Sequence, residues 1–382
     1  MIIKNGNLFC DDGEFRKYDI ETNGEVISAI GESLSCDNLE IADAQDCYVI
    51  PGLLDIHSHG SMGADFCDGT SDAIEKIAKF QLKNGVTSFL GTTMSLPEGQ
   101  LTDICTAAEP FVNKEYPDRA VLRGIHLEGP FFNQSKRGAQ NPDYIINPDY
   151  DMFLRLIDAS GETVRIIAVA PELDGGLDFI KFASLDCKIS IGHSSADYET
   201  ACSAYLGGAN HATHLFNGMT PFSHREPGII GAAFDYGVYV ELIADGIHVH
   251  PSAVRAVFKL YGDDKVCLIS DSMRACGLED GSYDLGGQAV TVIGKEARVA
   301  DGSLAGSVTP LTDCMRNAVS FGVPLASAIK SVTINPAKSV GLDNEIGSLT
   351  TGKRADILVL DKDLNLKQII FGGNPIFIFC GP

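Results

Sequence analysis

Four histidines and two carboxylates are the residues of this chain best suited to bind a metal ion together. They are His57, His59, Glu128, His193, His214 and Asp271. Imidazole nitrogens combined with carboxylate oxygens form a ligand set that suits zinc, iron or a similar divalent cation. His57 and His59 are two residues apart, so in an extended segment both rings point to the same side and can reach one ion. Taken alone, this pair fits an ordinary surface or loop position equally well, so the elements that carry the six residues matter.

The elements that must position these residues have the pattern of repeated strand and helix units. Apolar, β-branched segments alternate with longer amphipathic ones, as in a parallel sheet covered by helices. The predicted strands are residues 47–57, 86–93, 120–128, 164–171, 187–193, 209–215, 238–245 and 265–271. Residues 71–85 and 251–262 have helical periodicity and follow the first and seventh strands. Eight such units predict an α/β fold built on a (β/α)8 TIM barrel.

Each candidate ligand lies at or beside the C-terminal end of a predicted strand. The first strand ends in His57 and His59, the third in Glu128, the fifth in His193, the sixth in His214 and the eighth in Asp271. Barrels of this class carry their reactive groups at that end. A buried ionised carboxylate costs several kcal/mol unless it is paired or bound to a cation. Any one of these residues could have a purely structural role, but their shared position predicts one metal site at the barrel mouth.

The two ends of the chain differ from the middle. Residues 1–48 and 345–382 contain short strands separated by glycine turns, as in antiparallel meanders. We expect them to form one small composite domain that resembles a β-sandwich, with the catalytic barrel of residues 49–344 inserted between them. The alternative is two unrelated tails.

Composition excludes several classes of protein. The formal charge of −22 disfavours nucleic acid as a partner, because duplex binding draws on clustered Lys and Arg. The 11 cysteines include no C-x-x-C pair, which argues against a disulfide framework and a thiolate zinc site. No uninterrupted apolar run long enough for a membrane span appears, and the N-terminus lacks the features of a signal peptide. We therefore expect a cytoplasmic protein that does not bind a membrane.

Several short motifs carry a resemblance to a known family. They are the H-x-H of residues 57–59, HLEGPF at 126–131, IGHS at 191–194, THLFNGM at 213–219, HREPG at 224–228 and ISD at 269–271. Together with the closing ADILVLDKDL, they resemble the amidohydrolase superfamily. Within it, they are similar to the deacetylases that act on N-acetylated amino-sugar 6-phosphates. The resemblance extends over nearly the whole chain and implies a barrel of the amidohydrolase type.

The resemblance assigns roles to the metal ligands. Glu128 would be the anionic ligand, with His193 and His214 on the same ion; in dihydroorotase-like relatives a carboxylated lysine of the fourth strand has that place. The fourth strand here, VRIIAVAPE, contains no lysine. His57 and His59 would hold a second ion with Glu128 as a bridge, and Asp271 would contact that ion. The implied cofactor is one or two divalent cations per subunit, zinc first, with iron, manganese or cobalt as alternatives.

The activity that the resemblance implies is hydrolysis of the acetamide of N-acetyl-D-glucosamine 6-phosphate to D-glucosamine 6-phosphate and acetate. A metal-activated water would attack the carbonyl, Asp271 would shuttle the proton, and His248 would orient or polarise the carbonyl. The galactosamine epimer and a cyclic amide are alternative substrates. A catalytically silent barrel and a protein that binds the sugar phosphate without turnover are alternatives from other classes.

Further residues are implied to bind the phosphorylated amino sugar. The expected substrate-binding residues are Ala139, Asn217, Gly218, Arg225, His248 and Leu304. Arg225 would contact the phosphate beside the backbone amides of Asn217 and Gly218, a combination that suits phosphate recognition. Leu304 would line the acetyl pocket and Ala139 would contact the sugar. The family also implies a homodimer in which His224 or Arg225 serves the neighbouring subunit.

Four other residues invite a functional role but have simpler explanations. We expect His126 and His211 to pack in the core or to support the ligands. His250 reads as a surface or helix-start residue, and Cys276, close after Asp271, as a packing residue.

Overall fold

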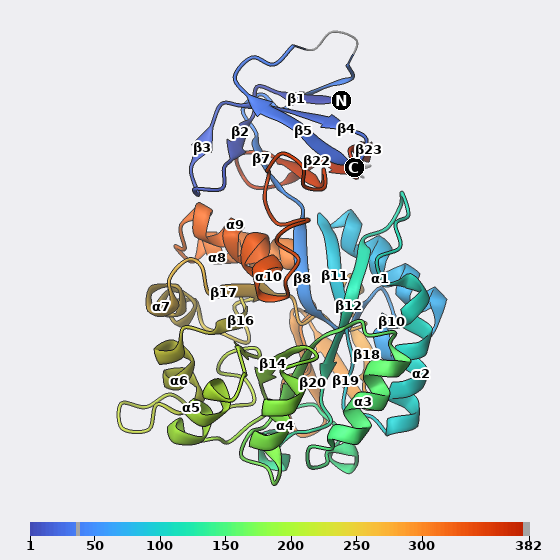
Figure 1. The fold of residues 1–382 in the computed structure, drawn as a ribbon, viewed down its shortest axis with the longest axis vertical. Coiled ribbons are helices and arrows are strands. Elements are labelled where there is room, and N and C mark those ends of the chain that lie inside the picture. Colours follow the sequence, from blue (N-terminus) through green and yellow to red (C-terminus); the bar gives the residue numbers. More distant parts are fainter. Residues whose placement is uncertain (36–38, 377–382) are drawn as a thin grey trace.

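In a computed structural model, the chain forms a large barrel and a smaller β domain stacked along the long axis of the molecule (Figure 1). The structure describes residues 1–35 and 39–376. Residues 36–38 and 377–382 of the predicted composite domain lie outside the described residues. The first and last described segments lie together in the smaller domain (Figure 1).

Eight parallel strands form the sheet of the barrel. They are β8 (Leu53–Ser58), β11 (Val86–Thr92), β12 (Val121–Glu128), β13 (Val164–Val169), β14 (Lys188–Ile191), β15 (His211–Ala212), β16 (Tyr239–Ile243) and β17 (Val266–Ile269). Each strand pairs with its neighbour in chain order. Nearly all their residues are buried, as expected for a parallel sheet covered by helices outside and filled by side chains inside. The predicted (β/α)8 barrel is confirmed.

The barrel closes between its first and last strands through the side chain of Asp55. The hydroxyl of Ser270 donates to Asp55 Oδ2 at 2.5 Å, and the Ser270 amide lies 3.3 Å from Oδ1. The amide of Asp271 donates to the carbonyl of His57 at 2.9 Å. Burial raises the pKa of Asp55 to about 6, against the opposing hydrogen bonds from Ser270. These contacts bring the C-terminal ends of β8 and β17 together, and both ends carry candidate ligands.

Helices cover the outside of the barrel. They are α1 (Ser71–Lys83), α2 (Glu98–Ala108), α3 (Tyr150–Ala159), α4 (Gly176–Ala183), α5 (Tyr198–Leu206), α6 (Gly228–Tyr236), α7 (Pro251–Tyr261), α8 (Leu311–Ser320), α9 (Leu325–Val332) and α10 (Ile334–Ser339). The predicted helix at 71–85 is α1, which buries Ile74 and Ile77. Its N-cap is Thr70, whose hydroxyl accepts from the amide of Ala73. Among the described residues, none of the helices has the length and apolar character needed to cross a membrane.

Strands from both chain ends build the smaller domain. One sheet has the order β5 (Val26–Gly31), β4 (Asp19–Asn23), β1 (Ile2–Lys4) and β6 (Ile41–Asp43). The other has the order β23 (Asn374–Ile376), β22 (Leu366–Phe371), β21 (Ile357–Leu360), β7 (Tyr48–Pro51), β2 (Asn7–Phe9) and β3 (Phe15–Arg16). The pairs β1 with β6 and β2 with β7 are parallel, so the sheets are not the purely antiparallel meanders expected from the turns.

The segment 47–57, predicted as one strand, is two strands that belong to different sheets. β7 pairs with β21 in the smaller domain, whereas β8 pairs with β11 in the barrel. The break is at Gly52, whose amide donates to the carbonyl of Asp356 at 2.8 Å. A side chain on Gly52 would overlap Thr87, so only glycine lets the chain cross between the sheets here. Because β7 leads directly into β8, the smaller domain lies at the end of the barrel opposite the strand ends that carry the ligands (Figure 1).

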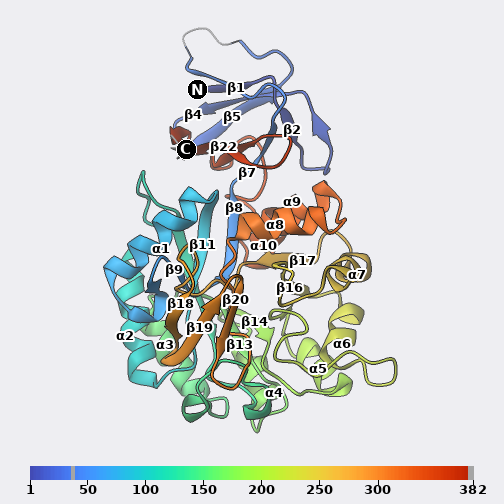
Figure 2. The same cartoon turned by 180° about the vertical axis from the view of Figure 1, so that it is seen from behind.

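A three-stranded antiparallel sheet after β17 was not expected from the sequence. It consists of β18 (Gly281–Leu285), β19 (Gln288–Ile293) and β20 (Glu296–Val299). These strands lie across the barrel on the side seen in Figure 2. Arg137 in the loop after β12 pairs with Asp301 beside β20, with 3.1 Å between Nη2 and Oδ2. The sheet and that loop thus meet over the barrel mouth.

Gly91 of β11 tests how closely the barrel packs against the segment after His59. A Cβ at this position would fall on the buried ring of Phe66, whose amide donates to the carbonyl of His59 at 2.7 Å. We expect Gly91→Ala to destabilise the fold by about 1–3 kcal/mol, because an overpacked core must shift. Gly99→Ala is the matched control, since nothing lies within 4 Å of its Cβ. Equal unfolding temperatures of the two variants would contradict this packing.

Candidate active site

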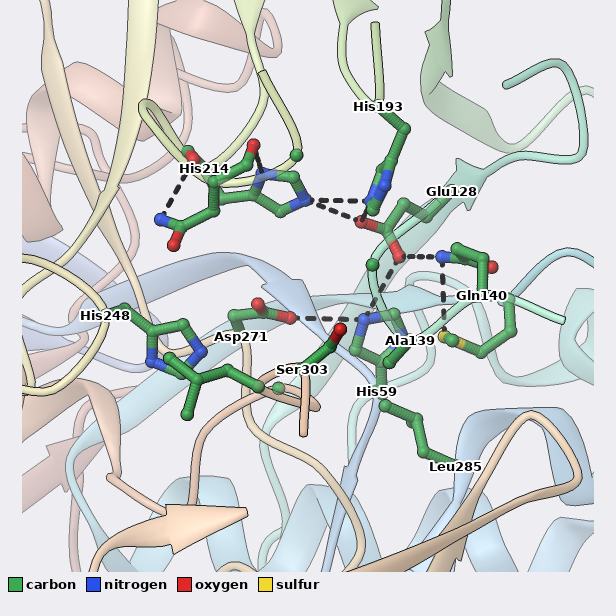
Figure 3. Close-up of a pocket in the computed structure, with 16 residues that line it drawn as sticks. His59, Glu128, Ala139, Gln140, His193, His214, His248, Asp271, Leu285 and Ser303 are labelled. Carbon is green, nitrogen blue, oxygen red and sulfur yellow. Dashed lines mark hydrogen bonds and ion pairs between the residues drawn. The ribbon is translucent and has the colours of Figure 1, made fainter. Parts of the chain in front are cut away.

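A cavity of about 290 Å³ opens at the C-terminal ends of the barrel strands. Most of the candidate residues line it, together with several that the sequence did not single out (Figure 3). The lining residues are His59, Met94, Glu128, Gly138, Ala139, Gln140, His193, His214, Asn217, Gly218, His248, Asp271, Leu285, Ser303, Leu304 and Gly306. His57 does not line the cavity and is completely buried. Arg225 and His224 lie in an exposed segment outside the cavity.

Glu128, the last residue of β12, faces two histidines from neighbouring strand ends. Its Oε1 lies 3.2 Å from Nε2 of His193 and 3.0 Å from Nε2 of His214. The two Nε2 atoms are 3.1 Å apart (Figure 3). Three imidazole or carboxylate atoms therefore converge on one point of the cavity wall.

The same carboxylate faces the histidine pair of the first strand. Nε2 of His57 is 3.5 Å from Glu128 Oε1, and Nε2 of His59 is 3.4 Å from Glu128 Oε2. Asp271 Oδ1 lies 3.5 Å from the first of these nitrogens and 3.2 Å from the second. Glu128 thus belongs to two ligand groups, one with His193 and His214 and one with His57 and His59.

The spacing of these atoms fits divalent cations. Ligands at about 2.0–2.1 Å from a tetrahedral ion are about 3.3–3.4 Å from one another. The Nε2 atoms of both groups each lie 3.0–3.5 Å from a carboxylate oxygen of Glu128. Nε2 of His57 is also buried without a hydrogen-bond partner among the described residues. The six residues can therefore hold a divalent metal cofactor, with Glu128 common to two positions.

The electrostatics of the cluster favour positive charge at its centre. Burial pushes the pKa of Glu128 upward, but the adjoining imidazoles of His193 and His214 outweigh it and hold that pKa well below the usual value. Burial is likewise outweighed at Asp271, where His57 and His59 lower the pKa to about 2. For His57, burial lowers the pKa, yet Asp271, Glu241 and Glu128 raise it to about 10. The acids thus stabilise positive charge at the rings, and a bound metal ion would supply that charge in place of the ring protons.

The backbone at three ligands is left-handed, which aims their side chains into the mouth. The φ angles are +47° at His193, +26° at His214 and +46° at Asp271. Non-glycine residues avoid this region, and each instance costs of order 1–3 kcal/mol. Such strain at three strand ends is typical of a functional site held in place by its surroundings.

Each of three ligands is held from behind by a hydrogen bond to its other ring nitrogen. Nδ1 of His193 donates to the carbonyl of Lys136 at 2.8 Å, and Nδ1 of His214 to the carbonyl of Asn217 at 3.1 Å. Nδ1 of His57 lies 2.9 Å from Oε2 of Glu241. In a neutral imidazole a proton on Nδ1 leaves Nε2 free as a ligand.

Gln140 and Glu241 are site residues that sequence reasoning missed. The amide of Gln140 donates to Glu128 Oε2 at 2.7 Å, and its oxygen accepts from the amide of Ser95 at 2.7 Å. Nothing in its loop sequence signals this contact. Glu241 did have a signal, because it is an acid within the apolar strand VYVELIAD, the same anomaly that marks Glu128.

His248 is held by an acid that follows β16. Nδ1 of His248 lies 2.7 Å from Oδ2 of Asp245, while the amides of Ile247 and His248 both donate to Oδ1 at 2.8 Å. Burial raises the pKa of Asp245, but the hydrogen bonds from His248 outweigh it, so the net pKa is lowered. His248 lies beside Asp271 on the cavity wall (Figure 3).

The remaining histidines and Cys276 lie where structural roles suffice. His126 is buried and its Nδ1 donates to the carbonyl of Ile56 at 3.0 Å. His211 is buried, with Nδ1 4.0 Å from Glu241 Oε1. His250 caps the start of α7, where Nδ1 accepts from the amide of Ser252. Cys276 is buried, and burial raises the pKa of its thiol.

Comparisons with known sequences and structures found similar proteins. A model described as the amidohydrolase family matches residues 48–379. The chain is 37% identical to the N-acetylglucosamine-6-phosphate deacetylase of Bacillus subtilis (strain 168), over 99% of this chain and 94% of the relative. It is 34% identical to the N-acetylgalactosamine-6-phosphate deacetylase of Escherichia coli O157:H7, over 97% of this chain and 98% of the relative. The chain also superposes on a solved structure from Mycobacterium smegmatis with a TM-score of 0.92, at 31% identity and with 98% of each chain covered. That structure is a mutant N-acetyl-D-glucosamine-6-phosphate deacetylase in complex with N-acetyl-D-glucosamine-6-phosphate.

Gln140 provides a test of the loop that borders the cavity. The substitution Gln140→Leu keeps a side chain of similar size but removes the buried donor to Glu128 Oε2. We expect metal affinity to fall about 10-fold or more, as when hydrogen-bond partners of metal ligands are removed. Gln134→Leu is the matched control, because Gln134 is in the same loop and its amide contacts only the carbonyl of Pro142 among the hydrogen bonds described. Metal content after dialysis against a chelator is the measurement. Equal retention in both variants would mean that Gln140 does not support Glu128.

Proposed function

The chain belongs to the amidohydrolase family, and we propose that it hydrolyses N-acetyl-D-glucosamine 6-phosphate to D-glucosamine 6-phosphate and acetate. The observation that carries this proposal is the convergence of His57, His59, Glu128, His193, His214 and Asp271 at the mouth of one small cavity. The names of the Bacillus subtilis relative and of the superposed structure support this substrate. The reaction is the cleavage of a linear amide and belongs to amino-sugar metabolism.

We propose sites for two divalent cations per subunit, and Glu128 would be a ligand in each site. His193 and His214 would hold one, and His57, His59 and Asp271 the other. Zinc is our first choice, and the same nitrogen and oxygen ligands suit iron, manganese or cobalt. When bound, such cations polarise a carbonyl and activate water for attack at neutral pH.

Asp271 is the proposed proton shuttle. Its low pKa keeps it ionised at neutral pH, so it can accept a proton from the attacking water as the new C–O bond forms. It then delivers that proton to the amide nitrogen as the C–N bond breaks, which releases the amine and acetate. His248, whose ring Asp245 holds on the cavity wall, orients or polarises the carbonyl oxygen.

The other parts of the substrate meet the remaining walls of the cavity. Ala139 would contact the sugar, and Leu304 would border the acetyl group. The backbone amides of Asn217 and Gly218 would donate to the phosphate. A phosphorylated sugar of this kind does not cross a lipid bilayer unaided, which supports a cytoplasmic enzyme.

Arg225 is the proposed phosphate cation, acting from a second copy of the chain. The protein has a formal charge of −22, so a substrate anion needs a local positive contact. Arg225 is exposed and does not line the cavity of its own subunit. A homodimer that carries the exposed segment with His224 and Arg225 to the neighbouring cavity would supply the missing charge.

Acetate release from N-acetylglucosamine 6-phosphate tests the reaction. The metal-loaded protein should turn over this substrate faster than the unphosphorylated sugar or the galactosamine epimer. Asp271→Asn should lower kcat by about 100-fold to 10,000-fold, since it removes the base and the acid at once. Metal content is measured in the same samples to separate proton transfer from metal loss. No acetate from fully loaded wild-type protein would reject the proposed function.

Mixed dimers test the role of Arg225. Arg225→Ala should raise KM for the phosphorylated sugar and leave the unphosphorylated sugar unaffected; Arg255→Ala is a surface control. When Arg225→Ala and Asp271→Asn chains are co-expressed, one site of each mixed dimer regains both native residues if the arginine acts across the interface. The low KM should then return. If it stays high, Arg225 acts within its own subunit.

A further inference from the structure

Glu241 is an acid buried in the middle of β16, beneath the floor of the cavity. Its side chain is completely inaccessible to solvent, and it is not among the residues that line the cavity. It therefore cannot touch the substrate. An ionised carboxylate at such a place costs several kcal/mol unless a partner compensates it.

The principal partner of Glu241 is the first histidine of the H-x-H motif. Glu241 Oε2 lies 2.9 Å from Nδ1 of His57. The next contact of this oxygen is the amide of His214 at 3.4 Å, and Oε1 has no hydrogen-bond partner among the described residues. His126, whose ring packs on that of His57, uses its own Nδ1 on the carbonyl of Ile56. Oε1 lies 4.0 Å from Nδ1 of His211, so among the described residues the hydrogen bond of the carboxylate to a ring is the one to His57.

The support behind the two proposed metal positions is unequal. His193 and His214 donate their Nδ1 protons to neutral backbone carbonyls. His57 alone has a carboxylate behind it, and Nδ1 of His59 has no partner among the described residues. The metal position formed by His57 and His59 is therefore supported by one buried charge. The position formed by His193 and His214 is supported by backbone carbonyls at the barrel mouth.

We propose that Glu241 is a positioning residue that determines whether the first-strand metal position is occupied. Nδ1–H of His57 donates a hydrogen bond to Glu241, which leaves Nε2 unprotonated and turned toward Glu128 and Asp271, where a cation would bind. Its negative charge also favours a cation on the far side of the ring. The inference rests on the metal-dependent hydrolysis proposed above and adds to it a residue that selects two ions over one.

Metal binding by Glu241→Gln tests this role. The substitution keeps the shape of the side chain but removes its charge. Cobalt titration followed by absorbance, together with metal content by mass spectrometry, should give two equivalents for the wild type. In Glu241→Gln, one equivalent should bind about 10-fold to 100-fold more weakly, and the other should bind as in the wild type.

Asp245→Asn is the matched control. Asp245 also pairs with a histidine Nδ1, at 2.7 Å, but its partner His248 is not a proposed ligand. This variant should lose activity and keep both metal equivalents at wild-type affinity. Loss of the same equivalent in Asp245→Asn would mean that any change of charge near the mouth weakens the metal, and it would overturn the proposal.

A double-mutant cycle separates positioning from general support of the fold. His57→Asn should lose the same equivalent as Glu241→Gln, and adding Glu241→Gln to it should weaken metal binding no further, because the acid acts through that ring. If Glu241→Gln fails to fold, Glu241→Asp, which keeps the charge at a shorter reach, takes its place in the cycle. Wild-type affinity for both equivalents in folded Glu241→Gln, or equal weakening of both, would overturn the proposal.

The experiment also separates this inference from the proposed function. Wild-type protein that binds two equivalents, loses one in Glu241→Gln and releases no acetate would support the role of Glu241 and reject the deacetylase. Wild-type protein that releases acetate with a single equivalent bound would support the deacetylase and overturn the role of Glu241.

Discussion

The sharing of one buried carboxylate among four imidazoles is the interaction on which the rest of the structure depends. Glu128 lies within 3.0–3.5 Å of the Nε2 atoms of His57, His59, His193 and His214. Separately, each of these polar groups would be costly to bury. Together, and with a cation among them, they compensate one another. The barrel serves this arrangement, since parallel strands in register deliver their C-terminal ends to one place.

Keeping the cluster in place requires support from several directions. Left-handed backbone at His193, His214 and Asp271 turns these side chains inward at a conformational cost. Gln140 holds Glu128 from the loop above, and Glu241 holds His57 from the strand below. Closure of the barrel through Asp55 and Ser270 brings the first and last strands together. The strain and the buried charge are therefore balanced by contacts from at least four separate segments of the chain.

The elements over the mouth limit what can reach the cluster. The loop of residues 133–142 is tied down by Asn133, whose amide donates to Glu172 Oε1 at 2.9 Å, and by the pair of Arg137 with Asp301. With the sheet of β18 to β20, this loop leaves a cavity of about 290 Å³. A space of that size suits a small acyl group and one sugar ring better than a polymer. The space available to a substrate is thus set by connections between the barrel strands rather than by the strands themselves.

What the sequence by itself determined was the barrel, the strand ends and the six residues with ligand chemistry. These follow from local features of the sequence. Apolar periodicity indicates the strands, and a charged or imidazole side chain at the end of an apolar run indicates a buried polar group that needs an ion or a hydrogen-bond partner. Only the tertiary structure decided that Glu241 lies behind His57, that Gln140 contacts Glu128, that residues 47–57 divide between two sheets, and that Arg225 lies outside its own cavity. The physical reason is that such contacts join residues far apart in the chain. Their distances depend on strand register, barrel closure and loop path, none of which leaves a mark on the local pattern of residues.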